Sequence, residues 1–206
     1  MARIDLHAHR EVTPIFSMSK PIRSFIAVGL DPSIGELIEN IQTELKKFNA
    51  DVKWVNPKQT HLTLKFLGDV SLERIGKIKK ILKEVCAKTA VITTEITELG
   101  AFPKIDFARV IWLGLKDEEK KLEALAAAIE HALVSLKFPK EKRNFMPHIT
   151  IGRVRSNKNL RDLGRQLKNY SLPSSLPQTI NEIVLFKSTL SSSGPIYEVI
   201  EKFIMT

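Results

Sequence analysis

The chain has 206 residues, of which 43% are hydrophobic, and a formal net charge of +9. This length suffices for one globular domain, and no apolar run approaches the roughly 20 residues that a membrane helix needs. The positive excess favours a polyanionic partner such as a nucleic acid or a nucleotide phosphate over the alternative of a surface simply rich in Lys and Glu. Cys86 is the single cysteine and falls at an apolar helix position. We therefore expect a buried free thiol, a reducing compartment and a cytoplasmic location.

Residues 1–19 precede the first predicted core strand, and we expect them to be an N-terminal extension, either an upstream start or a cloning remnant. His7 and His9 within it look like the His-x-His metal ligands of some metallohydrolase barrels. That class also needs alternating strands and helices and further ligands downstream, which the sequence lacks. We therefore predict no metal and no other cofactor, with residues 20–206 forming a single domain.

The first half of this domain predicts a strand over residues 23–30 and then an amphipathic helix, with Asp31 as its N-cap and Pro32 in its first turn. A short strand at 52–55 and a strand at 61–67 follow. Strict alternation along the latter puts His61, Thr63 and Lys65 on one face, opposite three apolar side chains. The polar face is therefore a candidate cleft floor.

The second half begins with a helix capped by Ser71. Further along we predict a strand hairpin over 91–99 and 108–115, a helix over 117–136 in which His131 is structural or exposed, and a basic, aromatic loop over 137–147. That loop either contacts phosphates and a stacked base or is simply solvated. A strand at His148, a short helix from Leu160, a Pro/Ser linker over 171–179 and closing strands over 183–186 and 196–203 complete the chain.

One short pattern occurs twice, as His61-Leu62-Thr63-Leu64 and His148-Ile149-Thr150-Ile151. Each copy reads as a strand on which the His and the Thr share a face. The apolar runs that end in Gly29-Leu30 and Gly114-Leu115 precede the two copies at a similar offset. We interpret the sequence as an internal duplication in an α+β fold, in which a pseudo-two-fold axis brings both histidines to one cleft.

Two histidines that face each other suit acid/base chemistry at phosphorus. With an ordinary pKa near 6.5, one imidazole can accept a proton at neutral pH while the other donates one. The hydroxyl groups of Thr63 and Thr150 can donate hydrogen bonds to the non-bridging oxygens. This scheme requires no metal.

The segments Thr60-His61-Leu62-Thr63-Leu64-Lys65-Phe66-Leu67-Gly68 and Met146-Pro147-His148-Ile149-Thr150-Ile151-Gly152-Arg153 resemble the paired motifs of the 2H phosphoesterase superfamily. Within it, the chain is most similar to the RNA 2′,3′-cyclic phosphodiesterases, also called the 2′-5′ RNA ligase family. Residues 23–28 are similar to the N-terminal strand of that family. The resemblance implies a bilobal α+β fold, with two antiparallel sheets facing across a central cleft and helices outside.

The resemblance also implies an activity, the hydrolysis of RNA 2′,3′-cyclic phosphate ends to 2′-phosphomonoesters. It assigns His61 as proton donor, His148 as proton acceptor, and Thr63 and Thr150 as phosphate-binding residues. Arg153 matches a position that contacts phosphate in relatives, yet strict alternation puts it on the face opposite His148. A twist or bulge near Gly152 would reconcile the two. Phe66, at the corresponding place after the first motif, either belongs to the core or faces a base.

Two alternatives remain open at this point. One is ATP-independent joining of RNA ends in a 2′-5′ linkage at the same site, and the other is a non-catalytic module that binds RNA or nucleotides. The chain carries no P-loop and no lysine motif for adenylylation, which argues against an ATP-driven ligase. We expect a monomer that acts on RNA ends such as tRNA fragments and has no membrane partner.

Overall fold

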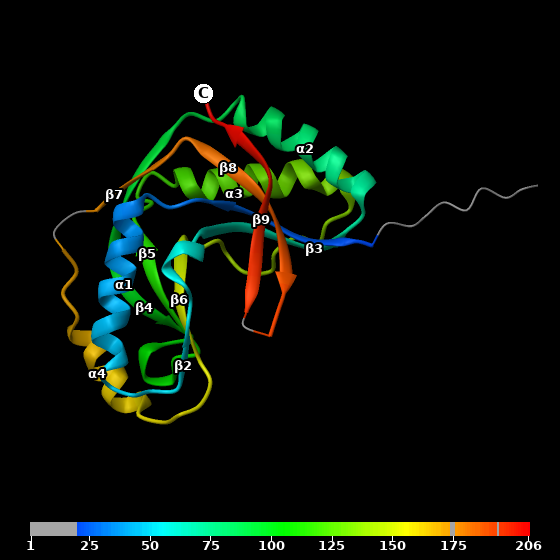
Figure 1. Cartoon of the computed structure of the whole chain (residues 1–206). Coiled ribbons are helices and arrows are strands. Elements are labelled where there is room, and N and C mark those ends of the chain that lie inside the picture. Colours follow the sequence, from blue (N-terminus) through cyan, green and yellow to red (C-terminus); the bar gives the residue numbers. More distant parts are fainter. Residues whose placement is uncertain (1–19, 174–175, 193) are drawn as a thin grey trace, which may run out of the picture.

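The computed structural model describes residues 20–173, 176–192 and 194–206. His7 and His9 lie outside the described residues. The described chain forms one curled antiparallel sheet with the strand order β7-β4-β5-β6-β3-β1-β8-β9, and β2 pairs with β6 (Figure 1). The strands are β1 (Ile22–Val28), β2 (Val52–Trp54), β3 (Leu62–Val70), β4 (Ile92–Phe102), β5 (Val110–Leu115), β6 (His148–Val154), β7 (Pro177–Ile180), β8 (Glu182–Leu190) and β9 (Pro195–Ile204).

Four α-helices cover one face of this sheet. They are α1 (Pro32–Lys46), α2 (Leu72–Cys86), α3 (Lys121–Ala132) and α4 (Leu160–Asn169), with short 3₁₀ segments η1 (Pro57–Gln59), η2 (Ile105–Phe107) and η3 (Leu133–Leu136). Helices α1 and α4 lie beside β4, β5 and β6, whereas α2 and α3 lie across β3 and β8 (Figure 1). We call the sheet face without helices the open face. None of the described helices is long and apolar enough to cross a membrane.

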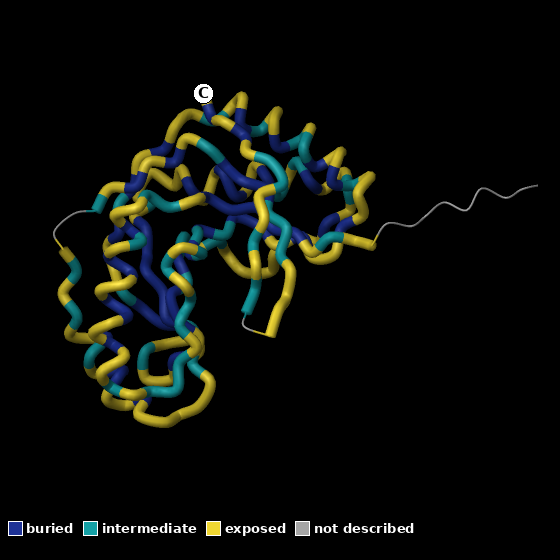
Figure 2. Tube along the Cα trace, in the orientation of Figure 1, coloured by how far each residue is buried: buried dark blue, intermediate teal, exposed yellow. Residues whose placement is uncertain are grey.

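The core lies between the helices and the covered face of the sheet (Figure 2). Helix α1 contributes a stripe at three- and four-residue spacing, because only that spacing keeps side chains on one side of a helix. Its buried apolar residues are Ile34, Leu37, Ile38, Ile41 and Leu45. Cys86 is also buried in this core, as predicted, and burial raises the pKa of its thiol to about 11.

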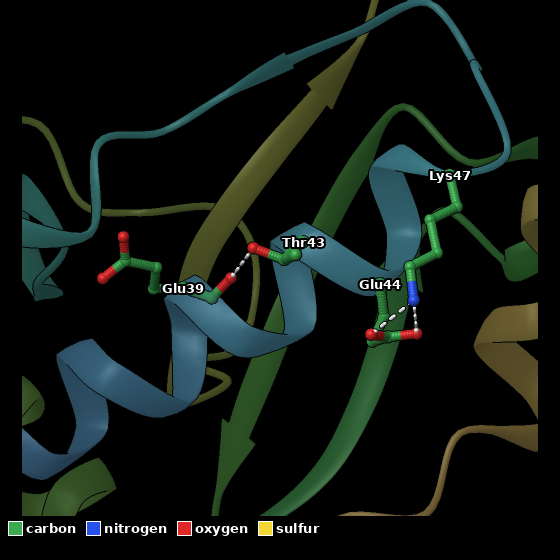
Figure 3. A network of polar contacts seen from close by, with 4 residues as sticks. All are labelled: Glu39, Thr43, Glu44 and Lys47. Atoms are coloured by element: carbon green, nitrogen blue, oxygen red, sulfur yellow. Dashed lines mark hydrogen bonds and ion pairs between the residues drawn. The ribbon is translucent and has the colours of Figure 1, made fainter.

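The opposite side of α1 is solvated and polar. Lys47 Nζ lies 2.7 Å from the Glu44 carboxylate, and Thr43 Oγ1 donates a hydrogen bond to the Glu39 carbonyl oxygen at 2.8 Å (Figure 3). Exposed pairs of this kind contribute at most about 0.5 kcal/mol to stability. The position of α1 therefore depends on its buried stripe.

The strand hairpin predicted from residues 91–115 is confirmed by the pairing of β4 with β5. Three other expectations need correction. The chain forms one hydrogen-bonded sheet in place of two separate sheets, because β3 and β6 pair directly at Leu62 and Ile149. The predicted 117–136 helix is the shorter α3 followed by η3. The predicted 171–179 linker runs into strand β7, whose Thr93–Thr179 pairing with β4 a sequence pattern cannot show.

Asp117 explains where α3 begins. Its carboxylate accepts the backbone N–H groups of Leu122 and Glu123, each at 2.9 Å. These donors have no partner inside the helix, and a carboxylate at a helix N-terminus stabilises them. Asp117 thus caps the helix from several residues before its first turn.

Candidate active site

His61 lies immediately before β3, at the end of a tight turn. Asn56 caps that turn by accepting the Lys58 backbone N–H at 3.0 Å, and Thr60 Oγ1 donates to the Pro57 carbonyl oxygen at 2.6 Å. The turn places the carbonyl oxygen of Gln59 2.9 Å from His61 Nδ1. The ring of this half-buried histidine is therefore held by the backbone two residues before it.

His148 is the first residue of β6 and is held in the same way. Its Nδ1 lies 2.7 Å from the carbonyl oxygen of Met146. The neighbouring Pro147 carbonyl oxygen accepts the Leu115 backbone N–H at 3.2 Å, which ties this turn to β5. Both histidines thus use a carbonyl group two residues earlier in the chain.

These contacts assign the tautomer of both rings. A carbonyl oxygen only accepts, so Nδ1 must carry the proton in each histidine. The remaining nitrogen, Nε2, then has a free lone pair when the ring is neutral and a proton to give when it is charged. Each histidine is therefore prepared to exchange a proton through Nε2.

The sheet brings the two motifs together. Leu62 of β3 pairs with Ile149 of β6, and both are fully buried on the helix-covered side. Continuing this antiparallel register by one residue in each direction places His61 opposite Thr150, and Thr63 opposite His148. Their side chains then share the open face, where facing Cβ atoms are about 4.5–5.5 Å apart.

A β-bulge in each strand decides which later side chains reach the open face. Along β3, Ala27 pairs with Thr63 but Ile26 pairs with Lys65, so Leu64 is an extra residue. Along β6, Trp112 pairs with Thr150 but Ile111 pairs with Gly152, so Ile151 is extra. A bulge shifts the alternation by one position. Both motifs therefore have the bulge at the same place, immediately after the threonine.

The β6 bulge places Arg153 opposite Val110, on the same side as Trp112 and Thr150. Arg153 is exposed, and its charge lowers the pKa of Tyr197 against the larger effect of burial, which raises it. Arg153 thus lies on the histidine face near Tyr197. Strict alternation predicts the wrong face for Arg153. The bulge near Gly152, which would bring Arg153 to the face of His148, is present.

The equivalent shift in β3 corrects the expectation for Lys65. This residue is 3% exposed and points away from the open face. Its Nζ lies 2.8 Å from Glu130 Oε2 of α3 and donates to the Pro139 carbonyl oxygen at 3.0 Å. Lys65 is therefore not part of the site floor. The adjacent Phe66 is 63% exposed, with its ring centroid 6.1 Å from that of Phe25.

Aromatic rings surround both histidines. The His61 ring lies 4.8 Å from Phe25 and 5.2 Å from Tyr197, between centroids. The His148 ring lies 5.0 Å from Phe102 and 6.4 Å from Trp112. These neighbours fix the imidazole planes and exclude water from their sides. No local sequence signal marks Phe25, Tyr197 or Phe102 as neighbours of the site, because each comes from a strand distant in the chain.

Burial lowers the pKa of His61 below its ordinary value of 6.5, and the Gln59 carbonyl group opposes this shift only in part. The cause is the cost of removing the imidazolium from water. The free protein therefore holds His61 mainly neutral at pH 7. A phosphate anion next to the ring would favour the charged form again.

The loop over residues 137–147 connects α3 to His148 and is held at its start. Glu130 Oε1 accepts the Glu141 backbone N–H at 3.1 Å, while the other carboxylate oxygen binds Lys65. Arg74 donates to the Leu136 carbonyl oxygen at 2.5 Å and lies 4.2 Å above the Phe138 ring. His131, on α3, is exposed. Among the described residues, no cluster of His, Cys, Asp or Glu could hold a metal ion.

The family model of the 2′-5′ RNA ligase superfamily matches residues 27–190. The chain belongs to this superfamily. The resemblance stated from the two His-x-Thr motifs is thereby confirmed.

Relatives in this superfamily span nearly the whole chain. The RNA 2′,3′-cyclic phosphodiesterase of Aquifex aeolicus is 35% identical over 187 residues, which cover 89% of this chain and 97% of the relative. The protein of the same name from Archaeoglobus fulgidus is 37% identical over 183 residues, covering 88% and 99%. Among solved structures, apo E. coli LigT has a TM-score of 0.73 at 24% identity, covering 91% of this chain and 99% of that one. This last likeness shows the shared fold.

Proposed function

We propose that the protein hydrolyses the 2′,3′-cyclic phosphate at RNA ends to a 2′-phosphomonoester, by metal-independent general acid/base catalysis. One observation carries this proposal. Two histidines on directly paired strands, each with Nδ1 bound to a carbonyl oxygen, keep Nε2 for proton transfer on one sheet face. The names of the curated relatives support the enzyme class, since each is an RNA 2′,3′-cyclic phosphodiesterase.

In this mechanism His148 takes a proton from water as its oxygen attacks the phosphorus atom. The bond between phosphorus and the 3′-oxygen breaks, and His61 gives that oxygen a proton. The net change is the addition of one water molecule, and the two histidines end with exchanged protonation states. The resemblance to the superfamily supplies the assignment of donor and acceptor. The lowered pKa of His61 adds a condition, because the donor must regain its proton when the phosphate binds.

The substrate phosphate lies between the two threonines in this proposal. Thr63 and Thr150 are half-buried next to the histidines, and their hydroxyl groups can donate to the non-bridging oxygens. Arg153, farther along the same face, binds a phosphate group of the substrate RNA. The exposed guanidinium and its place opposite Val110 support this role.

We also propose that the two motifs are halves of a pseudo-two-fold repeat whose lobes border a shared cleft. Three shared features support the repeat. Both motifs have a bulge immediately after the threonine, and both histidines contact a carbonyl oxygen through Nδ1. Phe66 and Arg153 also stand at the same distance after their threonines. Residues 20–206 then act as one domain, as a cytoplasmic monomer, on RNA ends such as tRNA fragments.

The test uses a short RNA that ends in a 2′,3′-cyclic phosphate, incubated with the protein and EDTA. Separation of 2′- from 3′-phosphate products should show only the former. His61→Ala and His148→Ala should each lower kcat by about 10²- to 10⁴-fold, whereas His131→Ala, on exposed α3 surface, should match the wild type.

Other outcomes would contradict the proposal in different ways. Turnover only with added divalent metal would exclude the metal-independent mechanism. Bound but unreacted RNA, with equal affinity in both variants, would favour a binding module. Formation of a 2′-5′ linkage between added RNA ends as the dominant reaction would identify end joining as the activity.

A further inference from the structure

Two cations face each other across β2 and β6, next to the candidate active site. Lys53 of β2 is the pairing partner of Arg153 of β6, and both are exposed. Their neighbours Val52 and Trp54 pack against the core, and a Cβ on Gly152 would lie 2.9 Å from Val52 Cγ1. Since side chains alternate along a strand, Lys53 and Arg153 both point to the open face.

This cation pair is unusual because nothing in the described chain neutralises it. Like charges directly opposite each other on paired strands are destabilising. Neither Lys53 nor Arg153 forms an ion pair with a carboxylate among the residues that the structure describes, although many other surface lysines do. An anion from outside the chain would remove this repulsion.

The position of the pair relative to the histidines indicates which anion. Strands β3 and β2 pair with the same edge of β6, one after the other. The facing pairs His61–Thr150 and Lys53–Arg153 therefore lie along one line between these strands, which we call the seam. Thr150 and Arg153 face Trp112 and Val110, which are two residues apart on β5, so the bulge leaves roughly 7 Å between them along the strand. This spacing leaves room for a phosphate group beside the cation pair in addition to the one between the threonines.

Lys53 also lies close to the β8–β9 hairpin, whose tip points toward β2 (Figure 1). A Cβ on Gly194 would lie 3.7 Å from Lys53 Nζ. The ammonium group therefore lies beside Gly194 of this hairpin.

We propose that Lys53 and Arg153 bind a second phosphate of the substrate, the one on the 5′ side of its terminal nucleoside. This inference rests on the proposed function. In an RNA with a 2′,3′-cyclic end, the next negative charge is this phosphate, and two cations on one face match its oxygens. The site then selects RNA chains over mononucleoside cyclic phosphates.

Three substrates test this inference: a mononucleoside 2′,3′-cyclic phosphate, the same compound with a 5′-phosphate, and a dinucleotide with a 2′,3′-cyclic end. For the wild type, we expect kcat/KM to be at least about tenfold higher for the last two, because a charged hydrogen bond to phosphate supplies this factor. The 5′-phosphorylated mononucleotide separates the contribution of the phosphate from that of a second base.

For the variant Lys53→Gln, kcat/KM for the 5′-phosphorylated mononucleotide divided by kcat/KM for the unphosphorylated one should move toward one. Lys83→Gln, an exposed lysine on α2, is the charge-matched control and should keep the wild-type ratio. For the dinucleotide, Lys53→Gln should also make the slope of log kcat/KM against log salt concentration shallower, because one charged contact to phosphate is lost. Thermal unfolding of Lys53→Gln should occur at no lower a temperature than in the wild type, since the substitution removes a repulsion.

Two results would overturn the inference. If the wild type hydrolyses all three substrates with equal kcat/KM, the proposed function stands and the second phosphate site does not. If Lys53→Gln and Lys83→Gln change the ratio equally, general surface charge accounts for the preference. Absence of turnover on all three substrates would instead refute the proposed function, and this inference with it.

Discussion

The two His-x-Thr strands share a backbone design but differ in what surrounds them. After each threonine comes a bulge, and then one side chain directed to the helices and one to the open face. In β3 these are Lys65, buried in an ion pair, and Phe66. In β6 they are Gly152, whose side is filled by Trp54, and Arg153. The common backbone fixes where the histidines stand, and burial at the β3 motif lowers the pKa of His61.

The largest effect should separate the proton donor from the acceptor. An aryl phosphodiester with a nitrophenolate leaving group needs no proton on the departing oxygen. With this substrate, His61→Ala should recover most of the wild-type rate, whereas His148→Ala should remain slower by about 10²- to 10⁴-fold. Equal losses in both variants would show that the two motifs are functionally equivalent, and recovery in His148→Ala would reverse the roles.

A second prediction concerns the buried ion pair that only the β3 motif has. Glu130→Ala leaves the Lys65 ammonium buried without its partner and should lower the free energy of unfolding by about 3 kcal/mol, because an uncompensated buried charge is costly. Urea denaturation measures this change. Glu44→Ala on α1 breaks an exposed pair and should cost less than about 0.5 kcal/mol.

The double variant Lys65→Met, Glu130→Ala sharpens this test. It removes the stranded charge, so it should be more stable than Glu130→Ala alone. If the double variant loses as much free energy of unfolding as Lys65→Met and Glu130→Ala together, the pair contributes packing rather than charge compensation.

The smallest effect should come from the pH dependence of stability. The folded-state pKa of His61 is lowered by burial, so the unfolded chain binds a proton more readily at pH values below about 6.5. Acidification from pH 7 should therefore reduce the free energy of unfolding, until the pH falls below the folded-state pKa. His61→Gln should flatten this part of the curve, as measured by urea denaturation at several pH values. An NMR titration that places the His61 pKa at or above 6.5 would contradict the assignment.

The sequence was sufficient for most of the elements and for relating the two motifs to each other. Apolar periodicity predicts α1 and α2, and the repeated His-x-Thr points to one site because a second copy is hard to explain by packing. The sequence was insufficient to predict which face of β3 carries Lys65. Counting alternate residues assumes an unbroken strand, and the bulge at Leu64 violates that assumption. Lys53 escaped notice because a cation on a three-residue strand carries no pattern, and only the pairing with β6 gives it meaning.

The continuous sheet has a consequence for how the protein handles a substrate. His61 and His148 stand next to residues joined by a β-ladder, so their separation is set by the spacing of neighbouring strands and not by the angle of a hinge. In the proposed mechanism, the acid and the base are thus aligned before any ligand arrives, and binding has no need to draw two bodies together. Under the proposed function, an RNA end must adopt the conformation that fits this preset spacing of the two histidines.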